Sequence, residues 1–376
     1  MTTQPRIAVY GATGFTGKLV VRELASRVDS FIIAGRTQSK LDVLAAEVRA
    51  SHDVVVQTRQ ASVDYAASLD TMLDGVDVLI NCAGPFCDVG LPVVAAALRN
   101  EVHYFDTTGE QSFMRQVQQD FGARARERGV VLAPATAYEY AVGGFAARLA
   151  VRAGADRLGI CYAQRNSGMS HGTKKSVLRA ITNPGLTFID GKLSKCRMGY
   201  RVFDVPRPGR PGVSALWIPG GESLQVPLFA EHITQVETCV ATGARVGRAL
   251  QRGLGLFVPA LGFARPILDR LIDRSDGDPH RDKAAPMKSS ERSSAEDKMT
   301  VGDHQPEFRV TAFDPDDGSF FVAIAGGDPY LTTARIIVEA ARRVIAAPPK
   351  QGGFTSAAAL FDARDFLEAV ELEIIE

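Results

Sequence analysis

The fold of this chain is decided by seven residues near its amino terminus, Gly11-Ala12-Thr13-Gly14-Phe15-Thr16-Gly17. The apolar run 7–10 precedes them and the helix-like stretch 18–24 follows them, which predicts a strand, a glycine-rich turn and a helix start. Glycines let the backbone turn sharply and approach a pyrophosphate, whose charge the free amides of a helix start would hold. The stretch therefore predicts a dinucleotide site, with an ordinary glycine turn as the alternative.

The second predicted strand, residues 31–36, ends in Arg36, roughly 20 residues after the glycines, where such folds contact the ribose. A carboxylate at this position accepts hydrogen bonds from the 2′-hydroxyl of NAD, whereas a guanidinium matches the 2′-phosphate of NADP. Thr37 and Lys40 add donors nearby. NADP is therefore favoured over NAD, with a solvated arginine at a helix start as the alternative.

Bulk composition is typical of a two-domain enzyme of the cytoplasm. The 376 residues exceed the usual single-core limit of about 250–300, so two domains are expected. Lysine plus arginine and aspartate plus glutamate balance at 43 each, which gives no reason to expect nucleic acid. The five cysteines lack disulfide or metal-ligand spacing, so no metal is expected. Residues 253–264, the longest uncharged apolar run of the carboxyl half, are too short to cross a bilayer.

Strand-like and helix-like segments alternate over the first third of the chain, which predicts an α/β fold with a doubly wound parallel sheet of the Rossmann type. Asp64 precedes a helix predicted over 65–73. It is expected to bind the adenine amino group, and capping of that helix is an alternative that is compatible with this role. Residues 82–86 follow a strand whose carboxyl end faces the cofactor crevice. Tyr104 and Asp106 end a later strand and are expected to shape the nicotinamide pocket, with strand packing as the alternative for Tyr104. The other elements expected here are strands over 54–56, 76–81 and 102–106 and helices over 39–50 and 91–99.

Seven short motifs are distributed along most of the chain. They are GATGFTGKLV (11–20), AGR (34–36), NCAGPF (81–86), HYFDTTGE (103–110), SHGT (170–173), GGDPY (326–330) and GFTSAA (353–358). Together they resemble the saccharopine dehydrogenase-like oxidoreductases, with the bacterial trans-acting enoyl reductases as the closest branch.

The resemblance implies an NADP-binding Rossmann domain over 1–134, a mixed α/β substrate domain over 135–328 and a carboxyl-terminal segment, 329–376, that returns to the first domain. In that picture the glycine-rich loop holds the pyrophosphate, Arg36 holds the 2′-phosphate, and residues 83–86 lie beside the ribose and nicotinamide. With Thr37 and Asp64 from the preceding arguments, the predicted cofactor-binding residues are Gly11, Thr13, Gly14, Phe15, Gly17, Arg36, Thr37, Asp64, Ala83, Gly84 and Phe86.

One turn departs from the relatives and carries the predicted proton donors. Residues 135–141 read ATAYEYA where relatives commonly have a Gly-Phe-Asp-Ser-like turn, so the substrate of the relatives is not implied here. Tyr138 and Tyr140 follow a strand end that should face the cleft, and His171 stands beside a glycine turn. Packing and capping are the alternatives for the tyrosines, and turn stabilisation is the alternative for His171. None of the eight tyrosines has a lysine four residues later, which disfavours the short-chain dehydrogenase mechanism.

The carboxyl half contains two unusual stretches. Residues 245–274 are apolar and carry six arginines. They either contact a membrane surface, a lipid tail or a carrier phosphate, or form core helices with arginines that reach solvent, which is the commoner case. Residues 273–307 are charged and serine-rich without an aromatic side chain, which predicts a mobile segment. Strands over 308–313 and 320–324 then predict a hairpin.

These observations predict an NADPH-dependent oxidoreductase that reduces an activated carbon–carbon double bond, by hydride attack at the β-carbon followed by protonation. The expected substrate is a hydrophobic lipid or polyketide-like molecule, free or carrier-bound, and a homodimer is compatible with the sequence. One alternative is imine or carbonyl reduction of the saccharopine dehydrogenase type, and another is a non-catalytic nucleotide-binding scaffold. For imine reduction, the candidate carboxylate clamps are Arg165, Lys174, Lys175 and Arg179.

Overall fold

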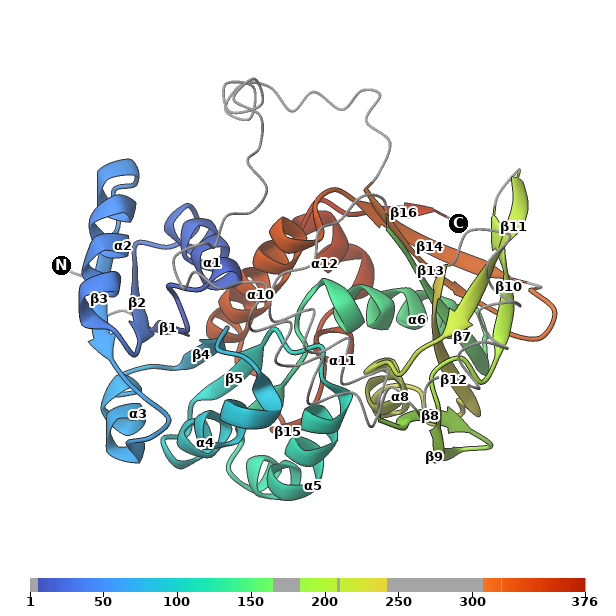
Figure 1. Ribbon diagram of the computed structural model, residues 1–376, viewed down its shortest axis with the longest axis horizontal. Helices are drawn as coiled ribbons and strands as arrows, with labels where there is room; N and C mark the ends of the chain where they lie inside the picture. Colours follow the sequence, from blue (N-terminus) through green and yellow to red (C-terminus); the bar gives the residue numbers. More distant parts are fainter. Residues whose placement is uncertain (1–5, 165–182, 208–209, 242–306, 319, 376) are drawn as a thin grey trace, which may run out of the picture.

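The computed structural model describes residues 6–164, 183–207, 210–241, 307–318 and 320–375. Within these ranges the chain forms two sheets, with helices α10 (Pro329–Ala346) and α12 (Ala363–Ala369) between them (Figure 1).

The first sheet is parallel throughout and confirms the predicted doubly wound arrangement. Its order is β15 (Gly353–Phe354), β6 (Val131–Ala133), β5 (His103–Asp106), β4 (Val78–Asn81), β1 (Ile7–Tyr10), β2 (Ser30–Gly35) and β3 (Val55–Gln60). The connecting helices are α1 (Phe15–Ala25), α2 (Gln38–Ser51), α3 (Ala66–Met72), α4 (Phe86–Arg99) and α5 (Gln111–Glu127). Because the strand order reverses between β1 and β4, a crevice for a ligand opens at the carboxyl ends of these two strands.

One helix boundary in this domain differs from the sequence prediction. Helix α4 begins at Phe86, not at residue 91. The carboxylate of Glu110 accepts hydrogen bonds from the backbone amides of Phe86 (2.8 Å) and Cys87 (3.2 Å), so a residue from the β5–α5 connection supports the first turn of α4. Negative charge at a helix start is favourable, but the local sequence around residue 86 does not contain this partner.

The second sheet is mixed, as predicted for the substrate domain. Its order is β10 (Val202–Arg207), β11 (Arg210–Trp217), β12 (Gln235–Ala241), β7 (Arg157–Gln164), β13 (Phe308–Phe313), β14 (Phe321–Gly326) and β16 (Glu373–Ile375), and the hairpin of β8 (Gly185–Ile189) and β9 (Lys192–Cys196) pairs with β12. Strands β7 and β12 are parallel, and β13 and β14 form the predicted antiparallel hairpin.

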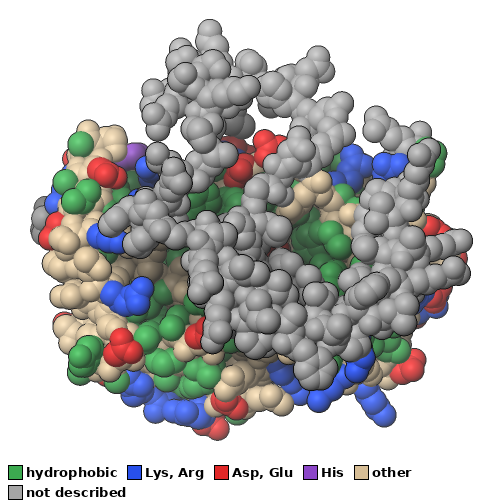
Figure 2. All heavy atoms as spheres, viewed as in Figure 1, with side chains coloured by type: hydrophobic (Ala, Val, Ile, Leu, Met, Phe, Trp, Pro, Cys, Tyr) green, Lys and Arg blue, Asp and Glu red, His purple; other side chains and the backbone are tan. Residues whose placement is uncertain are grey.

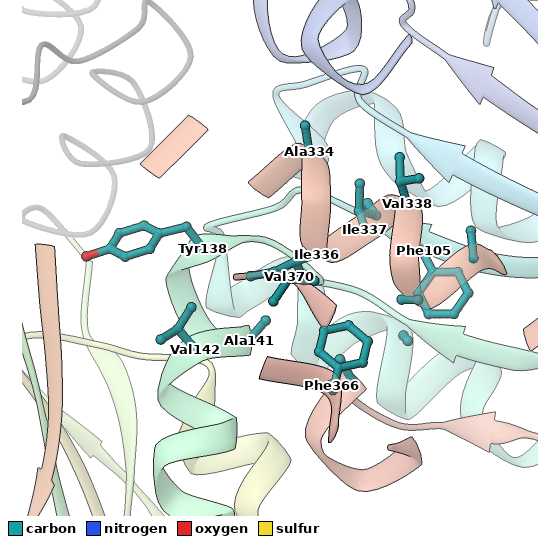
Figure 3. Packing of buried hydrophobic residues seen from close by; sticks show 14 of the residues in the cluster. Phe105, Tyr138, Ala141, Val142, Ala334, Ile336, Ile337, Val338, Phe366 and Val370 are labelled. Carbon is teal, nitrogen blue, oxygen red and sulfur yellow. The ribbon is translucent and has the colours of Figure 1, made fainter. Parts of the chain in front are cut away.

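The carboxyl-terminal segment connects the two sheets. Strand β15 pairs with β6 of the first sheet, and β16 pairs with β14 of the second. Helix α10, helix α12 and α6 (Gly143–Arg152) contribute to one hydrophobic core that also includes residues of both sheets. Figure 3 shows part of this core, where Phe105 of β5, Ile336 of α10 and Phe366 of α12 lie close together. The two sheets therefore share a core along their junction.

Candidate functional site

The glycine-rich loop turns directly from β1 into α1. Gly11 has a φ of +76°, and its amide donates to the carbonyl of Ala34 at the end of β2 (3.0 Å). A Cβ on Gly11 would lie 2.7 Å from the amide nitrogen of Ala83, and a Cβ on Gly17 would lie 2.2 Å from the carbonyl oxygen of Gly11. Glycine is therefore required at both positions by backbone conformation or by close packing.

Gly14 differs from these two glycines because the space around it is largely open. A Cβ there would meet only the carbonyl oxygen of Gly11, at 3.3 Å. Gly14 is the N-cap of α1, no side chain caps this helix within the described residues, and Gly14 and Phe15 are exposed. An uncapped helix start beside an exposed glycine fits an approaching pyrophosphate, so the loop fits the cofactor predicted for it.

The predicted 2′-phosphate site lies at the end of β2. Arg36 and Thr37 are exposed there, and the side-chain amide of Gln60 donates to the carbonyl of Arg36 (2.9 Å). Asp64 is also exposed, and its carboxylate accepts a hydrogen bond from the hydroxyl of Ser62 (2.9 Å). The N-cap of α3 is Tyr65, so the alternative that Asp64 caps this helix is wrong.

The charges of Arg36 and Asp64 both act on the pKa of the buried Tyr10 hydroxyl. Burial is the main reason that the pKa of Tyr10 is raised; the charge of Arg36 opposes this rise and that of Asp64 adds to it. Both charged side chains are therefore near the same hydroxyl, on the same edge of the sheet. A cation and a hydrogen-bond acceptor are thus both available where the adenosine half of the cofactor is expected.

The exit of β4 is held by a side chain of the same strand. The buried Asn81 accepts from the amide of Ala83 (2.9 Å) and donates to the hydroxyl of Tyr104 (3.0 Å). Ala83 is half-buried and Gly84 exposed, whereas Phe86 is buried against Phe113, with 5.7 Å between ring centroids. Of these three predicted cofactor contacts, Ala83 and Gly84 are accessible to solvent, and Phe86 is buried.

Asp106 ends β5 and links two loops of the crevice. Its Oδ1 accepts from the amides of Thr108 (2.9 Å) and Ala135 (2.8 Å), and its buried Oδ2 has no hydrogen-bond partner within the described chain. Burial raises the pKa of Asp106 to about 7, although the two backbone amides oppose the rise. The carboxyl group thus holds the exits of β5 and β6 together beside the crevice.

Tyr138 is fully buried in the shared core. Its ring centroid lies 4.5 Å from that of Phe308 and 5.8 Å from that of Tyr162, and its amide donates to the hydroxyl of Thr333 in α10 (3.0 Å). Figure 3 shows its ring directed away from Ile336. Burial strongly raises the pKa of its hydroxyl. These contacts agree with the packing alternative for Tyr138.

Tyr140 has different surroundings, although only one residue separates it from Tyr138. Its backbone is left-handed (φ +64°), and its hydroxyl donates to the carbonyl of Gly109 (3.0 Å). Its amide donates to the hydroxyl of Tyr162 (2.8 Å). Burial is the main cause that raises the pKa of Tyr140, so the hydroxyl stays protonated at neutral pH.

A cavity of about 790 Å³ opens beside Tyr140. Its walls are the start of α4, the outer face of α5 and the beginning of β8, and Lys195 of β9 also lines it. The buried Tyr140 and Pro219 form its inner part, and the exposed Gln119, Asp120 and Lys195 form its outer part. Figure 2 shows basic and acidic side chains interspersed along the lower edge of the molecule, where α4 and α5 lie. The cavity therefore combines an enclosed inner end with a charged entrance.

A buried carboxylate behind Tyr140 was not anticipated from the sequence. Glu222 of α8 (Glu222–Gln225) is fully buried, accepts a hydrogen bond from the hydroxyl of Tyr162, and accepts another from the hydroxyl of Thr238 (3.0 Å). The only local signal is the pair Gly220-Gly221 before it, which reads as an ordinary turn.

Some predicted residues lie outside the described part of the chain. They are His171, the four candidate clamps Arg165, Lys174, Lys175 and Arg179, the stretch 245–274 and nearly all of 273–307. Among the described residues, no group of three or more His, Cys, Asp or Glu side chains could hold a metal ion. No helix in the same ranges is both long and apolar enough to span a bilayer.

The strand order, the glycine-rich loop and the uncapped start of α1 define a dinucleotide-binding domain of the Rossmann type, joined here to a second mixed sheet. Residues 7–132 match the family model described as the saccharopine dehydrogenase NADP binding domain, so this part of the chain is an NADP-binding domain of that type. The predicted cofactor and the resemblance to saccharopine dehydrogenase-like proteins are thereby confirmed.

Individual relatives agree with this assignment. A saccharopine dehydrogenase-like oxidoreductase of Mus musculus is 28% identical over 218 residues, which are 53% of this chain and 48% of the relative. A candidate trans-acting enoyl reductase of Mycobacterium tuberculosis is 35% identical over 145 residues, which are 37% of this chain and 34% of the relative. The chain thus matches between a third and a half of the length of these relatives.

The fold is also similar to a solved structure over its whole length. The apo saccharopine dehydrogenase (L-Glu forming) of Saccharomyces cerevisiae has a TM-score of 0.58 and 13% identity, with 99% of each chain covered. At this identity the similarity extends to the architecture of both sheets and no further.

Proposed function

We propose that this protein is an NADPH-dependent oxidoreductase that reduces an activated carbon–carbon double bond, with Tyr140 as the proton donor. The observation that carries the proposal is the position of Tyr140 at the inner end of the cavity, beside the carboxyl ends of the parallel strands. NADPH, when bound, supplies the hydride that adds to the β-carbon of the double bond. The hydroxyl of Tyr140 then supplies the proton that the α-carbon takes up.

Several contacts support the choice of Tyr140 over Tyr138. Tyr140 lines the cavity, whereas Tyr138 packs against Phe308 and Tyr162 in the core. Burial raises the pKa of Tyr140, so its hydroxyl is protonated at neutral pH and carries the proton that a general acid must give. The carbonyl of Gly109 accepts the hydrogen bond of this hydroxyl and thereby fixes its direction.

The residues that would hold the cofactor are the predicted set at the crevice. Gly11, Gly14 and the start of α1 would hold the pyrophosphate, and Arg36 with Thr37 would hold the 2′-phosphate. The exposed carboxylate of Asp64 would accept a hydrogen bond from the adenine amino group. Ala83 and Gly84 would line the nicotinamide half.

The substrate class proposed for the cavity comes from the resemblance to the enoyl reductases. The apolar Pro219 and Leu186 line part of the cavity, and most of the remaining lining is polar, with the exposed Gln119, Asp120 and Lys195 at its entrance. A hydrophobic lipid or polyketide-like chain would occupy the inner part, and a polar headgroup or carrier arm would lie at the entrance. The name of the Mycobacterium tuberculosis relative, a candidate trans-acting enoyl reductase, supports the same reaction type.

The cofactor assignment is tested by titrating the protein with NADPH and NADH while nicotinamide fluorescence is followed. We expect preferential binding of NADPH, and a loss of at least about tenfold, or roughly 1.4 kcal/mol, in Arg36→Ala. Equal weakening of NADH binding in this variant would contradict a contact with the 2′-phosphate. No binding of either nucleotide would leave only the scaffold alternative.

The reaction is tested by turnover of enoyl thioesters of increasing chain length, in parallel with carbonyl and imine substrates. Tyr140→Phe should bind NADPH normally and lose turnover by about 10²–10⁴-fold, because it lacks the hydroxyl that donates the proton. Tyr200→Phe is the control, because it removes a tyrosine hydroxyl that donates to buried Glu237 on the second sheet and does not line the cavity. Full turnover by Tyr140→Phe would exclude Tyr140 as the donor, and turnover of imines or carbonyls alone would favour that alternative.

A further inference from the structure

We infer that Tyr162 and Glu222 form a positioning pair that holds Tyr140 in its left-handed backbone conformation and so fixes its hydroxyl at the inner end of the cavity. Neither residue lines the cavity, so both act through Tyr140. The inference rests on the proposed function, since it explains how the proton donor is held in place.

The backbone of Tyr140 needs such support. Its φ of +64° and ψ of −36° lie in a region that residues other than glycine rarely occupy. A conformation of this kind persists only when the surrounding structure holds it. At Tyr140 the holding contact is the hydrogen bond from its own amide to the hydroxyl oxygen of Tyr162, at 2.8 Å.

Glu222 determines which way the hydroxyl of Tyr162 faces. A tyrosine hydroxyl has one proton to donate and lone pairs that accept. The proton of Tyr162 goes to the carboxylate of Glu222, so a lone pair is available to the amide of Tyr140. Thr238 donates to the other oxygen of Glu222 at 3.0 Å and holds that carboxylate from the opposite side.

The chain keeps space for this buried pair with two glycines. A Cβ on Gly143 would lie 2.2 Å from Oε1 of Glu222 and 2.3 Å from the hydroxyl oxygen of Tyr162. A Cβ on Gly220 would lie 2.1 Å from the hydroxyl of Thr238 and 2.5 Å from Oε2 of Glu222. Burial raises the pKa of Glu222, and its hydrogen bonds to Tyr162 and Thr238 oppose the rise. A buried acid that is enclosed on both sides keeps a fixed geometry.

A second tyrosine–carboxylate pair, formed by the exposed Tyr200 and by Glu237 of β12, serves as the control. Tyr200 donates to fully buried Glu237, which also accepts from Arg201 (2.6 Å). None of these three residues contacts the backbone of Tyr140 through a hydrogen bond that the structure shows. Loss of the hydroxyl in Tyr200→Phe therefore measures the structural cost of such a pair without the effect on Tyr140.

The experiment compares Tyr162→Phe and Tyr200→Phe in steady-state turnover and in hydrogen exchange of the backbone over residues 138–142. We expect Tyr162→Phe to lower kcat by about 10–100-fold, because a displacement of about 1 Å at a reacting group costs up to 10²-fold. KM and the affinity for NADPH should stay within about threefold, and the amide of Tyr140 should exchange faster. Tyr200→Phe should leave kcat and this exchange unchanged.

A pair of variants at Glu222 tests the same inference if Tyr162→Phe does not fold. Glu222→Gln keeps an oxygen that accepts from Tyr162 and should keep kcat within about fivefold, whereas Glu222→Met, of similar length, should lose turnover as Tyr162→Phe does. Equal kcat in Glu222→Gln and Glu222→Met would overturn the inference.

The exchange measurement separates this inference from the proposed function. If the wild-type protein turns over no substrate, the proposed function has failed, but exchange at Tyr140 still reports whether Tyr162 holds the backbone. Unchanged exchange in Tyr162→Phe would overturn the positioning role whatever the activity. Faster exchange with unchanged kcat would overturn the part of the inference that links this conformation to the proton donor.

Discussion

The glycine-rich loop and the surroundings of Tyr140 are built in opposite ways. The loop depends on the absence of side chains, because a Cβ at Gly11 or Gly17 would collide with backbone atoms. Tyr140 depends on the presence of side chains, because Tyr162 and Glu222 supply the hydrogen bonds behind it. The first candidate site is therefore made of backbone, and the second is made of side chains from distant parts of the sequence.

The sequence distances show what this difference means. The seven residues of the loop are contiguous, so one short motif contains most of the site. Around Tyr138 and Tyr140 the hydrogen bonds reach partners 22, 31 and 195 residues away. A backbone-built site can thus be recognised by a local pattern, whereas a site built by side chains exists only once the chain has folded.

The largest expected effect is at Gly17, in the backbone-built part. Gly17→Ala would place a methyl group 2.2 Å from the carbonyl of Gly11, so the loop must move and its amides leave their positions. We expect the affinity for NADPH to fall by more than about 10³-fold, equal to about 4 kcal/mol, together with a loss of stability. Isothermal titration and urea unfolding measure both quantities.

Gly14→Ala is the matched variant, because its methyl group would meet only the carbonyl of Gly11, at 3.3 Å. Its stability should stay within about 1 kcal/mol of the wild type, while the affinity for NADPH falls. If Gly14→Ala bound NADPH as tightly as the wild type does, the open space at Gly14 would not be the phosphate site. The difference expected between Gly14→Ala and Gly17→Ala would then have no basis in phosphate binding.

The next effect concerns Asp106, a side chain that holds the exits of β5 and β6 together. Its pKa in the folded protein is raised from 3.8 to about 7, so ionisation costs more in the folded protein than in the unfolded chain. The stability that this group contributes is complete below about pH 4 and is lost as the pH rises through about 7. A shift of about three pKa units corresponds to about 4 kcal/mol at most.

Asp106→Asn removes this titration and keeps an oxygen for the amides of Thr108 and Ala135. Between pH 4 and pH 8, the wild type should therefore lose stability relative to the variant by up to about 4 kcal/mol. Urea unfolding at several pH values gives this difference. Parallel stability curves for the two proteins would mean that Asp106 ionises in the folded protein as easily as in water.

Much of the fold followed from local patterns. Apolar runs before and after the glycines predicted β1 and α1, and the run ending at Arg36 predicted β2. The hairpin of β13 and β14 was also predicted, because two β-rich runs flank a turn rich in aspartate and glycine. In each case the residues that determine the element are adjacent in the sequence.

The features that the sequence did not reveal depend on distant partners. Helix α4 starts five residues earlier than predicted because Glu110, from another loop, binds its first amides. Glu222 had no motif, since its role depends on Tyr162 and on the space left by Gly143. The cofactor-binding and catalytic assignments remain predictions, and the experiments described here test them.

The smallest expected effect concerns a contact between the glycine-rich loop and the start of α10. Phe15, in the glycine-rich loop, makes an edge-to-face contact with Tyr330 of the GGDPY motif, with 4.9 Å between ring centroids. Asp328 of the same motif caps α10 by accepting from the amides of Tyr330 and Leu331 (2.8 Å each). The motif therefore has a structural role, in which it starts α10 and presents an aromatic ring to the loop.

A double-mutant cycle with Phe15→Leu and Tyr330→Leu measures this contact. We expect a coupling energy of about 0.5–1.5 kcal/mol in unfolding, because both rings lose their aromatic partner while an apolar side chain remains. Phe15→Leu should also weaken NADPH binding slightly, and Tyr330→Leu should weaken it equally if the contact holds the loop in its binding conformation. A coupling energy near zero would mean that the contact between Phe15 and Tyr330 does not stabilise the loop, which would then depend on its backbone contacts with Ala34 and Ala83.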